Sequence, residues 1–134
     1  MSLFVDTSAI LAIIDADQPR HRDVVEAFDL AIDTGDPLFT SNYVLVETFA
    51  LAQRRLGLPA SRDLAVSFVP LLNTLWVDES IHETALSVLL ASGRRSLSLV
   101  DCTSFEIMRR HGLTQALALD RDFQQQGFQV APAS

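Results

Sequence analysis

Four acidic residues stand at separated points of the chain where carboxylates could act together. Asp6 ends the apolar run of residues 3–5, and Asp120 ends the apolar run of residues 115–119. Glu47 lies inside an apolar helical segment, and Asp101 begins another. Because an isolated buried carboxylate costs several kcal/mol, such a group must be paired, protonated or bound to a metal.

A fold that gathers these four carboxylates would create a site for a hard cation. Like charges packed within a few ångströms raise one another's pKa unless a cation is present. Carboxylates without a His or Cys cluster are the ligands of Mg²⁺, with Mn²⁺ as a plausible substitute. Because Mg²⁺ keeps several of its waters, some of the four acids would act through water.

Each acid also has a plainer interpretation that stays open. Asp6 and Asp101 could cap helices, and Asp120 could open a turn. Glu47 could face solvent from the surface of its helix. Asp122 is a second candidate for the fourth acid of the proposed cluster. It ranks below Asp120, because Asp120 directly ends the apolar run.

Short apolar runs alternate with amphipathic helices along the chain. Strands are expected at residues 3–5, 38–40, 75–77 and 115–119, with a fifth at 128–130. Helices are expected up to residue 14 and at 20–34, 43–56, 62–72, 80–91 and 100–110. For the helix at 80–91, Ser80 with Glu83 fits a capping box, and Asp78 is the alternative cap. The alternation predicts an α/β fold with a parallel sheet covered on both faces, whose strand carboxyl ends bind ligands.

Length and composition narrow the class of protein. The chain has 134 residues, of which 49% are hydrophobic, and no linker or composition break divides it, so one domain over residues 1–134 is expected. The single cysteine excludes a disulfide-stapled fold. No leader or membrane-spanning run is found, so the expected compartment is the cytoplasm and no membrane partner is expected.

The charge balance bears on nucleic-acid binding. The chain has 17 acidic residues and 10 basic ones, for a net charge of −7, and such a balance disfavours a nucleic-acid partner. However, a cluster of four acids that holds a metal would attract a phosphate, and the rest of the chain is only mildly acidic. All ten basic residues are arginines, which bind phosphate bidentately.

Four blocks of sequence hold the acids and their neighbours, at residues 4–9 (FVDTSA), 42–48 (NYVLVET), 98–105 (SLVDCTSF) and 118–123 (ALDRDF). In their order and spacing, these blocks resemble the PIN-domain ribonucleases, especially the VapC-type toxins. The resemblance covers residue 3 to about residue 130. It implies a three-layer α/β/α sandwich with a central, mostly parallel sheet of four to five short strands.

The resemblance also implies roles for individual residues. The family's acidic quartet matches Asp6, Glu47, Asp101 and Asp120. Of these, Asp6 and Asp101 match the pair usually assigned as direct Mg²⁺ ligands. Ser8 matches a hydroxyl that lies beside the first acid in the family. Ala118 departs from the pattern, because many members carry threonine there.

The implied function is Mg²⁺-dependent hydrolysis of RNA by the toxin of a type II toxin–antitoxin system, with a small antitoxin and a homodimer as partners. Arginines that could bind RNA phosphates occur at positions 54, 55, 94, 95, 109, 110 and 121. Two alternatives stay open, a housekeeping PIN-like nuclease without an antitoxin and a catalytically silent dimeric binding module. A phosphatase with an aspartate nucleophile is disfavoured, since its second aspartate would stand at the position of Ser8.

Overall fold

A five-stranded parallel sheet forms the centre of the computed structural model, which describes residues 1–133. The strands are β1 (Leu3–Val5), β2 (Leu38–Ser41), β3 (Asn73–Leu75), β4 (Gln115–Leu117) and β5 (Gln129–Ala131). Their order is β3-β2-β1-β4-β5, and every neighbouring pair is parallel. The carboxyl ends of all five strands therefore lie at the same edge of the sheet.

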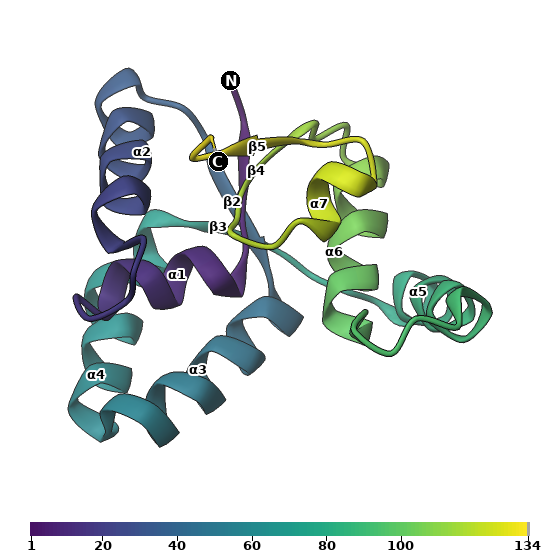
Figure 1. Cartoon of the computed structure of the whole chain (residues 1–134), viewed down its shortest axis with the longest axis horizontal. Coiled ribbons are helices and arrows are strands. Elements are labelled where there is room, and N and C mark those ends of the chain that lie inside the picture. Colours follow the sequence, from purple (N-terminus) through teal and green to yellow (C-terminus); the bar gives the residue numbers. More distant parts are fainter. Residues whose placement is uncertain (134) are drawn as a thin grey trace.

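Helices cover both faces of this sheet. They are α1 (Thr7–Ile14), α2 (His21–Thr34), α3 (Asn42–Leu56), α4 (Leu58–Asp63), α5 (Glu79–Ser92), α6 (Leu99–Arg110) and α7 (Asp122–Gln125). Figure 1 shows α1, α2 and α4 on one side of the strands and α5, α6 and α7 on the other. Helix α3 contacts both α1 and α6 beside the carboxyl ends. The predicted three-layer α/β/α sandwich is confirmed.

Buried apolar packing fixes the elements that carry the acids. Phe4 and Val5 of the central strand β1 are fully buried, as expected for a strand covered on both faces. On the far side of the sheet, the Phe105 ring of α6 meets the Phe123 ring of α7 edge-on, with 5.0 Å between centroids. This contact holds α7 against α6 and therefore brings the beginnings of the two helices together.

Strand β3 begins two residues earlier than the sequence predicts. The expected strand at residues 75–77 is wrong, because Thr74 and Leu75 pair with Thr40 and Ser41 of β2. Trp76 lies beyond the pairing and is 72% exposed. The Val77 amide donates instead to Asn42 Oδ1 at 2.6 Å, which turns the chain toward α5.

Two other boundaries differ from expectation. Strand β4 ends at Leu117, so Asp120 lies in the loop after the strand and does not directly end it. The helix expected at residues 62–72 begins at Leu58, with Pro59 in its first turn, where a proline costs no hydrogen bond. It continues as a π-helical turn (Leu64–Phe68) and a 3₁₀ turn (Val69–Leu71).

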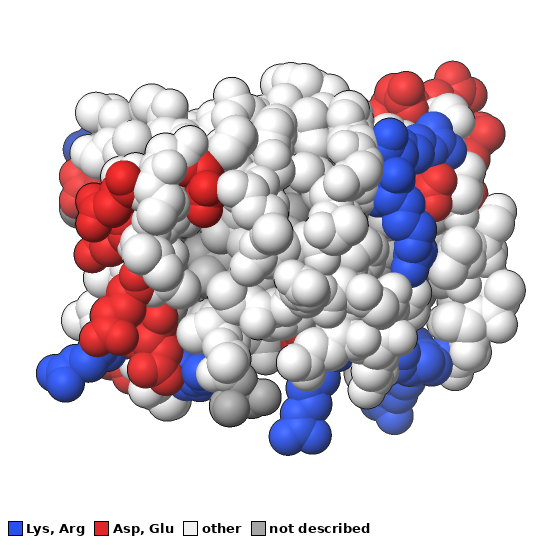
Figure 2. All heavy atoms as spheres, turned by 90° about the horizontal axis from the view of Figure 1, so that it is seen from above, with Lys and Arg blue, Asp and Glu red and all other residues white. Residues whose placement is uncertain are grey.

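Much of the acidic excess lies on one flank of the molecule, on α2. That helix carries Asp23, Glu26, Asp29 and Asp33. Figure 2 shows acidic side chains gathered on the α2 side and a band of arginine side chains toward the opposite side. Within residues 1–133, no helix combines the length and apolar character needed to cross a bilayer.

Helix α5 is capped by Asp78, whose Oδ1 accepts a hydrogen bond from the Ile81 amide at 2.9 Å. Of the two caps that the sequence left open, Asp78 is therefore confirmed and Ser80 is wrong. We expect Asp78→Ala to lower the free energy of unfolding by about 1 kcal/mol, because the α5 amides lose their acceptor. Urea denaturation measures this loss. Ser80→Ala is the matched control and is expected to cost less, and equal losses in the two variants would contradict the cap assignment.

Candidate active site

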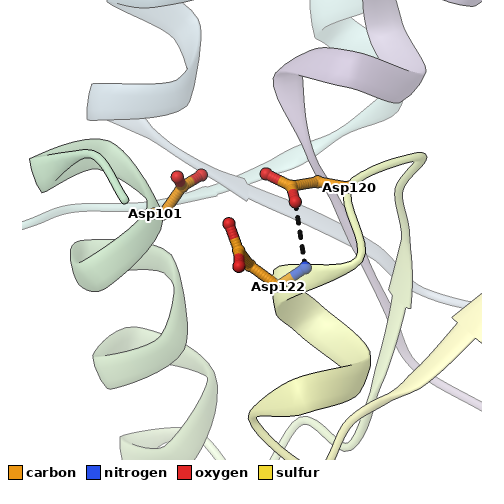
Figure 3. Close-up of side chains that lie close together, drawn as sticks. All are labelled: Asp101, Asp120 and Asp122. Atoms are coloured by element: carbon orange, nitrogen blue, oxygen red, sulfur yellow. Dashed lines mark hydrogen bonds between the residues drawn. The ribbon is translucent and has the colours of Figure 1, made fainter. Parts of the chain in front are cut away.

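Three carboxylates meet at the carboxyl end of the sheet. Asp101, Asp120 and Asp122 each place an oxygen within 4.8 Å of the other two. Figure 3 shows them converging from α6, from the loop after β4 and from α7. The Asp122 amide donates to Asp120 Oδ1 at 2.9 Å, which holds the loop against the start of α7.

Asp6 lies beside this cluster and is almost completely buried, at 4% exposure. It caps α1, and its Oδ2 accepts hydrogen bonds from the Ser8 amide at 3.1 Å and the Ser8 hydroxyl at 2.7 Å. The pKa of Asp6 is raised to about 7. Burial is the main cause, and the negative charges of Asp101 and Glu47 act in the same direction, while the Ser8 hydrogen bonds oppose the rise. Asp6 is therefore electrostatically part of the acidic site.

Asp101 is oriented by a capping box at the start of α6. Its Oδ2 accepts from the Ser98 amide at 3.1 Å, while the Asp101 amide donates to Ser98 Oγ at 3.0 Å. Burial raises the pKa of Asp101, the Ser98 bonds lower it, and the nearby charges of Glu47 and Asp122 raise it. Glu47 is half-buried on α3, which contacts α6, and its charge is close enough to act on Asp101.

The pKa of Asp120 is also raised, first by burial and then by the charges of Asp101 and Asp122. Asp122 differs from the other acids because it has a cationic partner. Arg94, in the connection between α5 and α6, places Nη2 2.7 Å from Asp122 Oδ1. Arg94 thus supplies one positive charge to a cluster that otherwise repels itself.

The Ser8 hydroxyl connects Asp6 to the loop that carries Asp120. Its hydroxyl donates to Asp6 and also accepts from the Leu119 amide at 2.9 Å, one residue before Asp120. The Ala118 side chain is buried, and its amide donates to Ala131 of β5. The hydroxyl that the resemblance implies at position 118 is therefore absent, and the Ser8 hydroxyl bonds the neighbouring Leu119 amide.

Of the four acids predicted from the sequence, Asp101 and Asp120 lie in the cluster, together with the alternative candidate Asp122. Asp6 and Glu47 lie outside this cluster, but near enough for their charges to affect the pKa of its members or of each other. Both Asp120 and Asp122 belong to the cluster, so the lower rank given to Asp122 is not supported by the geometry. The capping roles of Asp6 and Asp101 and the turn role of Asp120 are real as well. Sequence reasoning missed the pairing of Arg94 with Asp122, because no local pattern connects residues 28 positions apart.

The donors of this site suit a hard divalent cation. All are carboxylate oxygens, and their negative charge exceeds what Arg94 compensates. Within residues 1–133, no His or Cys joins such a cluster. The acids of the site therefore fit Mg²⁺ or Mn²⁺, and they do not fit a structural zinc centre.

The model of the PIN domain family matches residues 3–129, and the chain belongs to this family. It is 35% identical to the 23S rRNA-specific endonuclease VapC20 of Mycobacterium tuberculosis, over 94% of this chain and 95% of the relative. It is 29% identical to ribonuclease VapC26 of the same species, over 89% of this chain and 87% of the relative. The family predicted from four short sequence blocks is confirmed.

Solved structures agree with this assignment. The crystal structure of M. tuberculosis VapC20, described as a Sarcin-Ricin loop cleaving toxin, matches with a TM-score of 0.82 and 34% identity, over 94% of this chain and 95% of that one. FitAcB from Neisseria gonorrhoeae matches with a TM-score of 0.70 at 21% identity, over 97% of this chain and 96% of that one. DNA-bound VapBC from Salmonella typhimurium has the same TM-score and coverage at 17% identity. These two distant matches show a shared fold.

The raised pKa of Asp6 predicts how stability depends on pH. Its ordinary value is 3.8 and its folded value is about 7, so between these values the folded chain binds the proton more tightly than the unfolded chain. The metal-free protein should therefore lose stability as pH rises from about 4 to about 7, at up to about 1.4 kcal/mol per pH unit for one group.

Urea denaturation in EDTA at pH 5 and pH 8 measures this dependence. Asp6→Asn should reduce the loss of stability between pH 5 and pH 8, because the asparagine amide does not ionise. Asp29→Asn, at an exposed position of α2, is the control and should keep the loss of the wild type. If the metal-free protein is as stable at pH 8 as at pH 5, the proposed cause is wrong.

Arg94 gives a second prediction. Arg94→Ala removes the cation bonded to Asp122, so the metal-free protein should melt at a lower temperature. The rise in Tm on adding Mn²⁺ should become larger, because the metal then relieves more repulsion. Thermal melts with and without Mn²⁺ test this, with the neighbouring exposed Arg95→Ala as the matched control. Identical behaviour of the two variants would exclude the role assigned to Arg94.

Proposed function

We propose that this PIN-domain protein hydrolyses RNA phosphodiester bonds at its acidic site and is the toxin of a type II toxin–antitoxin system. The observation that carries the proposal is the convergence of Asp101, Asp120 and Asp122 beside Asp6 and Glu47 at the carboxyl end of the sheet. VapC20 and VapC26 support it, because both are named as RNA-cleaving enzymes.

The proposed cofactor is Mg²⁺, with Mn²⁺ as a substitute. Asp101, Asp120 and Asp122 would hold it with their converging oxygens. Asp6 would join them as a ligand, and Glu47 would add negative charge from beside them. The resemblance assigns Asp6 and Asp101 as direct ligands, and Asp6 keeps Oδ1 available for this role because Ser8 binds Oδ2. When bound, the metal lowers the pKa of an attacking water and stabilises charge on the phosphate oxygens.

The protein's own residues orient the carboxylates before the metal binds. The Ser8 hydroxyl and amide fix Asp6, the Ser98 amide fixes Asp101, and Arg94 fixes Asp122. Cys102, next to Asp101, is buried as predicted from the sequence, and burial raises the pKa of its thiol. Cys102 is therefore not suited to act as a nucleophile, which agrees with attack by water.

A small antitoxin and a second copy of the chain are the proposed partners, and the cytoplasm is the proposed compartment. Exposed apolar side chains support an interface, with Val46 on α3 70% exposed and Leu90 on α5 75% exposed. Sedimentation of the purified protein tests the dimer. A short neighbouring reading frame with a DNA-binding head would separate the toxin from a housekeeping nuclease, whose active-site chemistry is the same.

Asp6→Asn and Asp101→Asn test the site directly. We expect each to lower metal-dependent RNA cleavage by at least about 100-fold, since the metal supplies several kcal/mol and each 1.4 kcal/mol is tenfold in rate. Ribosomal RNA incubated with Mg²⁺ or Mn²⁺ and resolved on a gel measures cleavage. Asp29→Asn should cut like the wild type. Full activity in both site variants, with the folded far-UV spectrum retained, would disprove the site.

A further inference from the structure

A polar cavity of about 480 Å³ lies directly beside the acidic cluster. Asp120 lines it and also belongs to the cluster, so the cavity adjoins the proposed site of cleavage. Its polar lining includes Arg20, Arg121 and Gln124, and its wall on the β5 side includes Pro132. Two arginines that are 101 positions apart in the sequence therefore line one cavity next to the carboxylates.

Arg20 is held in place at the start of α2. Its Nε lies 3.2 Å from Asp23 Oδ2, and its Nη2 donates to the Ala133 carbonyl at 2.9 Å. These two contacts leave Nη1 as a donor for a ligand. Arg121 is exposed at the start of α7, and it makes no ion pair within residues 1–133. The cavity is thus lined by Arg20, which is held by two contacts, and by Arg121, which has no ion-pair partner within residues 1–133.

Several other arginines named as phosphate ligands from the sequence have different partners. Arg110 pairs with Glu106 at 2.8 Å and donates to Ser80. Arg109 donates to Gln126 at 2.9 Å and lies over the Phe128 ring at 5.3 Å. Arg94 is bonded to Asp122 inside the cluster. Arg121 lines the cavity, and it is joined there by Arg20, which the sequence did not single out.

The chemistry of this cavity matches one phosphate group. Paired guanidinium groups bind phosphate through charge-assisted, bidentate hydrogen bonds. An RNA strand with one phosphate at the acidic cluster must place the neighbouring phosphates close by, where a metal-free acidic surface would repel them. We propose that the cavity is a subsite for a phosphate of the RNA strand that flanks the scissile one. This inference rests on the ribonuclease function proposed above and specifies how that site holds its substrate.

Binding of a short, fluorescein-labelled single-stranded RNA of mixed sequence tests the subsite. Fluorescence anisotropy in EDTA, where metal-dependent cleavage is stopped, gives Kd at several salt concentrations. Arg20→Ala and Arg121→Ala should each raise Kd roughly tenfold, as expected for a lost charge-assisted bond. Because both arginines bind the same phosphate, the double variant should reduce the salt slope by only about 0.7, the value for one phosphate contact on a single strand.

Arg22→Ala is the matched control, since Arg22 is exposed on the same helix as Arg20 but does not line the cavity. An equal rise in Kd for Arg22→Ala would mean a general charge effect and overturn the subsite. Unchanged RNA binding in Arg121→Ala, whose exposed side chain has little part in folding, would also overturn it. If a polyglutamate peptide depends on both arginines while RNA does not, the cavity binds an acidic protein segment and the proposal is wrong.

A cleavage assay with Mn²⁺ separates this inference from the proposed function. If the wild type binds RNA through Arg20 and Arg121 but cuts none, the ribonuclease assignment fails and the phosphate-binding site stands. If the wild type cuts RNA and both variants keep its KM, the ribonuclease assignment stands and the subsite fails. The expected result is cleavage with a raised KM and a nearly unchanged kcat in both variants, since the subsite binds substrate away from the reacting atoms.

Discussion

The burial of carboxylates that also repel one another is the constraint on which the rest of this structure depends. Burial and mutual charge raise the pKa of Asp6, Asp101 and Asp120, so bringing them together costs free energy in the absence of a cation. The fold compensates with positive charge from its own elements. Asp6 and Asp101 sit at the beginnings of α1 and α6, where the helix dipoles favour negative charge, and Arg94 reaches Asp122 from a separate connection.

The acids of the site serve the fold and the chemistry at once. One oxygen of each carboxylate accepts a hydrogen bond from a backbone amide, namely Oδ2 in Asp6 and Asp101 and Oδ1 in Asp120. The other oxygen of each carboxylate is left for a ligand. Helix capping and metal binding are therefore not competing interpretations of such residues. The same hydrogen bonds that begin α1 and α6 also fix the carboxylates, so the site is organised by local structure close to each acid.

The sequence predicted the sheet, most helices and the acids, because these depend on local patterns. It could not predict the register of β3, since the apolar run at residues 75–77 carries no information about which residues pair with β2. It placed Asp120 at the end of β4 because it could not show that pairing with β5 stops at Leu117. The contact of Arg94 with Asp122 and the place of Arg20 in the cavity beside Asp120 depend on the folded arrangement of distant connections, and no spacing rule reveals them.

The exposed position of Trp76 has a practical consequence for spectroscopy. It is the only tryptophan in the chain, and at 72% exposure its indole is already largely hydrated in the folded protein. Its emission should therefore change little when the chain unfolds, and far-UV circular dichroism is the better probe of unfolding, because the helices contribute its signal. Trp76 instead gives a native optical reporter of contacts at the connection between β3 and α5, where a covering molecule would shift its emission toward the blue.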